Sequence, residues 1–167
     1  SFEACDLRDL GALFQSHLES DDLSLCNFVF DVRLEQCHEV AGDYRTLVVT
    51  LPAKQIIDVF GRHSHKIFRL NPRGPLGNKV NTGIKATLQD RLLRRMFHVL
   101  NNGLSAICES YRLSNTALEI RDFQIVNGCQ TTVTLWNVRS LIQNDPEVLV
   151  NLKLVECPQH FHNLIAR

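Results

Sequence analysis

The sequence lacks the short motifs that mark several large classes of enzyme. It has no Gly-x-Ser-x-Gly turn for a nucleophilic serine, no Walker A lysine loop and no Gly-x-Gly-x-x-Gly fingerprint. No two carboxylates stand out as a pair for two-metal phosphodiester cleavage. No two cysteines have the Cys-x-x-Cys spacing usual in structural zinc sites. We therefore expect no metal site, no cofactor and no complete catalytic constellation, and whether the protein is an enzyme stays open.

An excess of charge of one sign is also missing. The 18 lysines and arginines balance 18 aspartates and glutamates, so any contact with nucleic acid would need a local patch. No apolar run is long enough to span a membrane, and no signal peptide opens the chain, so we expect a cytoplasmic protein without a membrane partner. The six cysteines are expected to be reduced, because a chain of this size needs no disulfides.

The sequence does contain enough hydrophobic residues to form a core. At 167 residues and 44% hydrophobic content, the chain is expected to form a single domain, residues 1–167. A helical pattern that begins at Pro158 is still running at Arg167. This favours a fragment, the N-terminal or central part of a longer protein, whose remaining domains would be its natural partners.

Hydrophobic periodicity predicts an α+β fold with a small mixed sheet and helices packed mainly on one side. Residues 26–34 and 44–51 are expected to form two paired strands. Further strands are expected at 66–70, 104–108, 118–120, 123–126 and 148–156. Helices are expected at 6–20, 53–60, 80–96, 130–143 and from 158 onward, the third being one helix or two broken near Gln89 and Asp90.

A turn between an expected strand and an expected helix is the first candidate for a functional site. The strand over residues 123–126 runs into an Asn-Gly turn that opens the helix, which would point free N–H groups and the positive helix end at whatever lies in front. The turn holds neutral donors and no carboxylate that would repel an anion. Its candidate residues are Asn127, Gly128, Gln130, Thr131 and Thr132.

Two other turns share this neutral, amide-rich composition. Proline and glycine exclude regular structure from residues 71–77, where Asn71, Arg73 and Gly74 are candidates for binding an anion. The alternative is a plain connector with a solvated arginine. The second turn is expected to reverse the chain at the end of a helix, leaving the Asn101 amide free. Its candidate residues are Asn101, Asn102 and Gly103.

Three further features have competing interpretations. Cys129 at the expected helix start could be an activated nucleophile, although a small buried residue is the more usual role of a cysteine. Asp122 is expected to form a salt bridge at the surface. A cluster of arginines could contact phosphate, but compensation of the helix dipole explains it adequately. These arginines are Arg91, Arg94 and Arg95.

Four ordered motifs carry a resemblance to a known family: Phe68 to Gly77, Val80 to Leu88, Phe97 to Gly103 and Gln124 to Thr131. In order and spacing they resemble the bacterial abortive infection phage resistance (AIPR) proteins. The resemblance implies a role in antiviral defence and a longer full-length protein.

Residues 125–131 also look like the Asp-Gly-Gln-His-Arg signature of proteins distantly similar to ParB. There the matching turn faces a nucleotide or DNA. Here Asn127 replaces the acid, and Thr131 and Thr132 replace the His-Arg pair, which puts nucleotide hydrolysis in doubt.

Together these patterns predict that the three turns converge at one edge of the sheet and bind a nucleotide or nucleic acid. Arg73 would compensate phosphate charge, while Asn101, Asn127 and Gln130 would recognise polar edges. One alternative is part of a metal-dependent nuclease whose catalytic residues lie outside this chain. Another is a structural scaffold, in which these amides and hydroxyls satisfy backbone groups.

Overall fold

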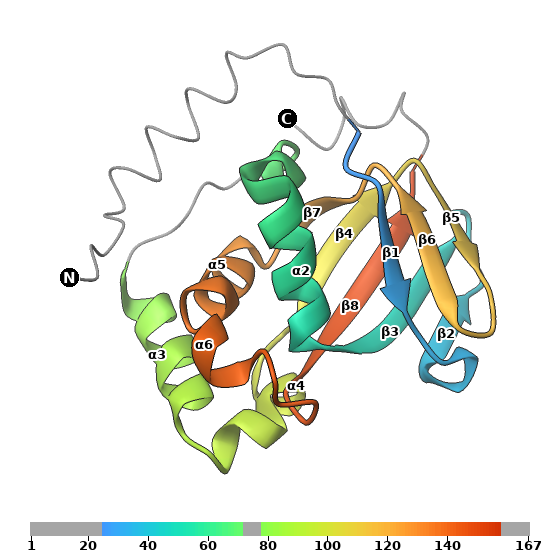
Figure 1. Ribbon diagram of the computed structural model, residues 1–167. Coiled ribbons are helices and arrows are strands. Elements are labelled where there is room, and N and C mark those ends of the chain that lie inside the picture. Colours follow the sequence, from blue (N-terminus) through green and yellow to red (C-terminus); the bar gives the residue numbers. More distant parts are fainter. Residues whose placement is uncertain (1–24, 72–77, 158–167) are drawn as a thin grey trace.

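The computed structural model describes residues 25–71 and 78–157 and shows an α+β fold with two sheets (Figure 1). The larger sheet is mixed, because β4 and β8 run parallel while the other neighbouring pairs are antiparallel. Its strands, in spatial order, are β2 (Cys37–Val40), β3 (Thr46–Pro52), β8 (Leu149–Glu156), β4 (Leu104–Cys108) and β7 (Gln124–Asn127).

The smaller sheet is antiparallel and consists of β1 (Phe28–Asp31), β6 (Ala117–Arg121) and β5 (Ser110–Leu113), in that order. Alternate residues of β1 and β6 are buried, the two-residue period expected of strands with one covered face. The inward Phe28 and Phe30 rings lie 4.9 Å apart, and Phe30 packs edge-on against Phe123 at 5.6 Å. These aromatic contacts join the small sheet to the common core.

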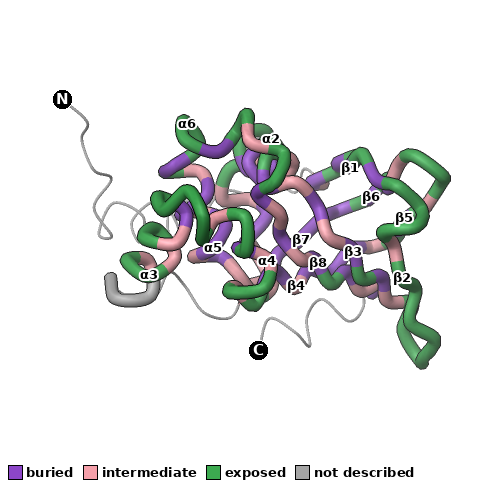
Figure 2. The backbone as a smooth tube through the Cα atoms, turned by 90° about the horizontal axis from the view of Figure 1, so that it is seen from below, coloured by how far each residue is buried: buried purple, intermediate pink, exposed green. Residues whose placement is uncertain are grey.

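The helices gather mainly on one side of the larger sheet, as expected (Figure 1). Their bounds are α2 (Ala53–His63), α3 (Asn78–Gln89), α4 (Phe97–Leu100), α5 (Cys129–Asn137) and α6 (Arg139–Ile142), with 3-10 turns η1 (Leu34–Gln36), η2 (Ser64–Phe68) and η3 (Leu93–Met96). Helix α2 packs on α5, and α3 packs on α5 in turn. Figure 2 shows buried residues concentrated where the helices meet the sheets.

Asp122 forms the corner at which the chain passes from β6 to β7 and so from one sheet to the other. It is 1% exposed and has a left-handed backbone, with φ of 52°. Its carboxylate accepts hydrogen bonds from the Cys26 N–H (3.3 Å) and the Gln124 amide (3.0 Å), and pairs with Arg69 at 3.1 Å. Its own N–H donates to Asn27 Oδ1 at 3.1 Å. The predicted salt bridge is present, but its expected place at the surface is wrong, because the Asp122 carboxylate lies at a buried corner.

A second polar cluster, centred on Arg45, also joins the two sheets. Arg45 pairs with Glu39 at 3.0 Å and with Glu156 at 3.4 Å, and its guanidinium lies 4.1 Å from the centre of the Tyr111 ring. The Tyr111 hydroxyl donates to Glu39 at 2.8 Å. Burial and this carboxylate raise the pKa of Tyr111, so the hydroxyl remains a donor throughout the physiological range.

Several predicted strands and pairings are wrong. Residues 66–70 are not a strand but mostly belong to η2, where Ile67 and Phe68 are both buried; alternation in a strand would have turned one outward. The strands at 26–34 and 44–51 do not pair with each other, since β1 pairs with β6 and β3 with β2 and β8. Strands β2 and β5 were not predicted.

The helix expected at 80–96 is broken, as one alternative predicted. The Asp90 carboxylate accepts the N–H groups of Leu92 at 2.8 Å and Leu93 at 3.0 Å, so it starts a new turn at η3. Within this predicted helix Leu88 is buried, whereas Leu92 and Met96 are exposed. The helix expected at 130–143 is also divided, into α5 and α6.

The helices expected at 6–20 and from 158 lie outside the described residues. Within the described ranges, no helix combines the length and the apolar character that a membrane span requires. Among the cysteines of these ranges, Cys26, Cys37, Cys108 and Cys129 are free thiols.

Replacing Asp122 by asparagine tests the buried corner. Asparagine tolerates the left-handed backbone but leaves Arg69 without its counter-charge. We expect the free energy of unfolding to fall by roughly 2–3 kcal/mol, less than for a fully buried pair because Arg69 stays partly exposed. Urea denaturation measures this. The control Asp58→Asn, in an exposed pair with Lys54, should cost under about 0.5 kcal/mol. Equal losses in both variants would contradict the role of Asp122.

Candidate functional site at the start of helix α5

Strand β7 ends at Asn127, and Gly128 starts α5 with φ of 100° and ψ of 17°. Glycine is required here, because a Cβ atom would lie 2.4 Å from Leu104 Cδ2 and 3.0 Å from the Gly103 carbonyl oxygen. Among the described residues, no side chain caps α5 and its first turn contains no acid. The predicted strand, turn and helix are therefore present, with the helix start unneutralised.

The Asn101–Gly103 turn meets the start of α5. Helix α4 ends at Asn101 and the chain reverses through Gly103, whose φ is 72°, as the sequence predicted. A Cβ atom on Gly103 would lie 2.3 Å from the Asn151 carbonyl oxygen, so this turn lies directly against β8. The Thr131 hydroxyl donates to Asn101 Oδ1 at 3.4 Å. Two of the three candidate turns thus come together although they are distant in sequence.

Some of the candidate side chains hold this junction together. Asn101 Oδ1 accepts the Gly103 N–H at 2.9 Å, so the expectation that its amide is left free is wrong. The Thr132 hydroxyl donates to the Gly128 carbonyl at 3.0 Å, and Thr131 and Thr132 are buried. These three side chains fix the backbone of the two turns.

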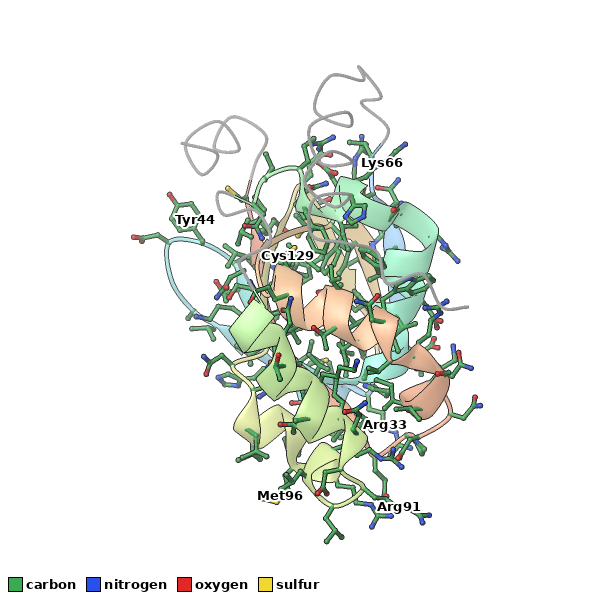
Figure 3. The ribbon with its side chains drawn as sticks, turned by 90° about the vertical axis from the view of Figure 1, so that its left-hand side faces the viewer. Arg33, Tyr44, Lys66, Arg91, Met96 and Cys129 are labelled. Atoms are coloured by element: carbon green, nitrogen blue, oxygen red, sulfur yellow. The ribbon has the colours of Figure 1, made fainter. Side chains whose placement is uncertain are left out.

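Two of the remaining candidates, Asn102 and Asn127, are exposed, so a ligand could reach them. Gln130 is half-buried and makes a further contact. Figure 3 places Cys129 where α5 begins, beside α3.

The third predicted turn lies largely outside the described residues, which is where Arg73 and Gly74 fall. Asn71 is described and half-buried; its N–H donates to the Phe68 carbonyl at 2.9 Å, which closes the turn after η2. Asn71 also makes a further contact. Convergence of this loop with the other two turns stays a prediction.

Cys129 is not chemically activated. The thiol is buried, and burial raises its pKa to about 12, the opposite of the depression expected at a helix start. Desolvation of the thiolate therefore outweighs the helix dipole, and the nucleophile interpretation is wrong.

The described residues also offer little for metal or phosphate chemistry elsewhere. Within them, no group of three or more His, Cys, Asp or Glu side chains is arranged to hold a metal. Arg94 pairs with Asp145 at 3.2 Å and Arg95 with Glu147 at 2.7 Å. Ion pairing, rather than only the helix dipole, accounts for two members of the predicted arginine cluster.

A small pocket beside the Asn101 turn was not predicted from the sequence. Its volume is about 240 Å³, and α3 and the α4 region line it through Gly83, Ile84, Thr87, Phe97, Leu100 and Asn101. The sequence did carry one signal for it, a glycine in the middle of a helix, which costs stability unless space or close approach is needed. Here a Cβ atom on Gly83 would meet nothing within 4 Å.

Comparison with known proteins identifies a family. A family model described as AIPR protein matches residues 68–167, a range that includes both junction turns and α5. No curated protein and no solved structure matches the chain. The likeness to proteins similar to ParB is not confirmed by these comparisons.

Substituting Gly128 tests how tightly the two turns meet. Alanine at this position combines an unfavourable φ with contacts against Leu104 and Gly103, so we expect Gly128→Ala to lower the free energy of unfolding by roughly 2–4 kcal/mol. Thermal and urea denaturation measure the loss. Gly83→Ala is the control, and should be neutral or stabilise α3 by up to about 1 kcal/mol. A neutral Gly128→Ala variant would show that the turns are not held as described.

Alkylation tests the state of Cys129. Because its thiolate forms only as the pH approaches about 12, roughly one molecule in ten thousand carries it at pH 8. We expect iodoacetamide at pH 8 to label half-buried Cys37 well before Cys129, with mass spectrometry locating the modified sites. Faster labelling of Cys129 than of Cys37 would contradict the assignment.

Proposed function

We propose, from the premise that this chain belongs to the AIPR protein family, that the start of α5 is an anion site that binds a nucleotide or nucleic acid in abortive-infection phage defence. The observation that supports the proposal is the meeting of two Asn-Gly turns at an uncapped helix start without an acid in its first turn. Backbone N–H groups and the helix dipole favour negative charge at such a point.

The size of these effects indicates what kind of ligand is suitable. A single charge at an exposed helix start gains only about 0.3–1 kcal/mol from the dipole. A phosphate oxygen that also accepts hydrogen bonds from backbone N–H groups gains more, since hydrogen bonds to charged groups contribute roughly 1.5–3 kcal/mol each. A phosphate-bearing ligand therefore fits better than a simple monovalent anion.

The outward side chains suit recognition beyond the phosphate. Asparagine both donates and accepts, so the exposed Asn102 and Asn127 can bind the polar edges of a base or sugar, and Gln130 beside them has the same amide chemistry. Arg73 would add a guanidinium for the phosphate; it lies outside the described residues and its role stays a prediction. The scaffold alternative explains Asn101, Thr131 and Thr132 but leaves the exposed Asn102 and Asn127 without a structural task.

Adding a charge to the exposed Asn127 tests the site without disturbing the core. Aspartate just before the helix start complements the dipole, so Asn127→Asp should fold normally. The new carboxylate should repel phosphate and weaken binding by at least roughly tenfold. Calorimetric titration with nucleoside triphosphates and with short DNA or RNA measures the affinity. Asn115→Asp, an equal charge on an exposed residue between β5 and β6, is the matched control.

Removing single groups complements that experiment. Gln130→Ala and Arg73→Ala should each weaken the same titrations by several fold. Unchanged affinity in both variants, or equal weakening by Asn127→Asp and Asn115→Asp, would exclude a site at the start of α5.

A further inference from the structure

The segment from η3 through α4 leaves an apolar stripe uncovered. Five large apolar side chains within nine residues are exposed, by 44–78% of their surface: Leu92, Leu93, Met96, Val99 and Leu100. Their spacing of three and four residues is that of a helix face directed at a partner. Figure 3 shows Met96 on the outside of this end of the molecule. Exposed apolar residues are ordinary when scattered, but five within nine consecutive residues mark an interaction surface.

The stripe runs into the pocket of about 240 Å³ between α3 and α4. Leu100 belongs to both, buried Phe97 lines the pocket, and Gly83 adds no side chain of its own. Pockets for small molecules usually measure roughly 300–1,000 Å³. This smaller, mainly apolar one suits a single large side chain that projects from a helix. A stripe that ends in such a pocket is the arrangement by which grooves bind amphipathic helices.

We propose that residues 6–20 of this chain bind along the stripe as an amphipathic helix, with Phe14 or Leu10 in the pocket. In sequence, their apolar residues recur at helical spacing: Leu7, Leu10, Leu13, Phe14 and Leu18. With six or ten helical residues and five extended steps between the pocket and Leu25, the chain spans up to about 26 Å for Phe14 or about 32 Å for Leu10.

Charge favours the same occupant. Residues 1–24 contain six acids and a single basic residue, Arg8. Residues 78–100 contain five lysines and arginines and a single acid, Asp90. Because Arg94 and Arg95 already pair with acids, Lys85 and Arg91 are the exposed cations that would attract the acidic segment.

A second copy of the chain suits the stripe less well. Stable interfaces bury about 800 Å² on each partner, more than five side chains and a small pocket provide. A single docked helix from the same chain needs no such area, because its binding is intramolecular.

Hydrogen exchange on the intact 167-residue chain tests the proposal. In Leu10→Ser/Phe14→Ser, backbone amides of residues 92–100 should exchange roughly tenfold faster than in the wild type. The control Ala12→Ser changes the opposite helix face and should have no effect. Met96→Ser/Leu100→Ser should accelerate exchange over residues 6–20, whereas Leu141→Ser, at another exposed apolar residue, should not.

The variant Gly83→Leu provides a third, independent test of the proposal. It fills the pocket while improving helix propensity, so it should release residues 6–20 without unfolding the domain. Unchanged exchange over 92–100 in Leu10→Ser/Phe14→Ser would overturn the proposal. The proposal would also be overturned if hydrogen-exchange protection of residues 92–100 rose with protein concentration and were the same in Leu10→Ser/Phe14→Ser as in the wild type. A second copy of the chain would then cover the stripe.

Discussion

The buried carboxylate of Asp122 is the constraint on which the two-sheet arrangement depends. The chain leaves β6 and enters β7 across this residue, and its left-handed backbone turns the strand without a glycine. Cys26, Arg69 and Gln124 converge on the same carboxylate from three parts of the chain. A buried charge is tolerated only when paired and hydrogen-bonded, so the corner forms only when all three segments are in place. Its correct formation then sets the position of β7, and β7 sets the start of α5.

Local patterns predicted most helices and strands, because the spacing of apolar residues that marks each type can be read from consecutive residues. The strands at 104–108, 118–120 and 148–156 and the helix at 53–60 correspond to β4, β6, β8 and α2. The errors lie where a tertiary contact decides. Residues 66–70 are too short for their period to be informative, and the packing of Ile67 and Phe68 makes them a 3-10 turn. Strand pairing was wrong for a related reason, since neighbours in sequence do not have to be neighbours in a sheet.

The sequence predicted which residues make up the candidate site, but not which of them hold the turns together and which face solvent. Asn-Gly pairs correctly located two turns with positive φ, at Gly103 and Gly128. Nothing in the sequence says which amide turns inward. Only the contacts show that Asn101 and Thr132 satisfy backbone groups while Asn102 and Asn127 face outward. A polar turn has to meet its own hydrogen-bonding needs first, and what remains exposed defines the surface for a ligand.

Asn101 lies between the start of α5 and the pocket at the end of the apolar stripe. Its Oδ1 contacts the Gly103 N–H and the Thr131 hydroxyl at the start of α5, while the same residue lines the pocket between α3 and α4. A side chain in this pocket would contact the residue that holds the start of α5, where we propose the anion site. Coupling between the two proposed sites would therefore pass through Asn101, and by linkage it would be reciprocal. Docking of a helix on the stripe would in this way control how well the turn behind it holds an anion.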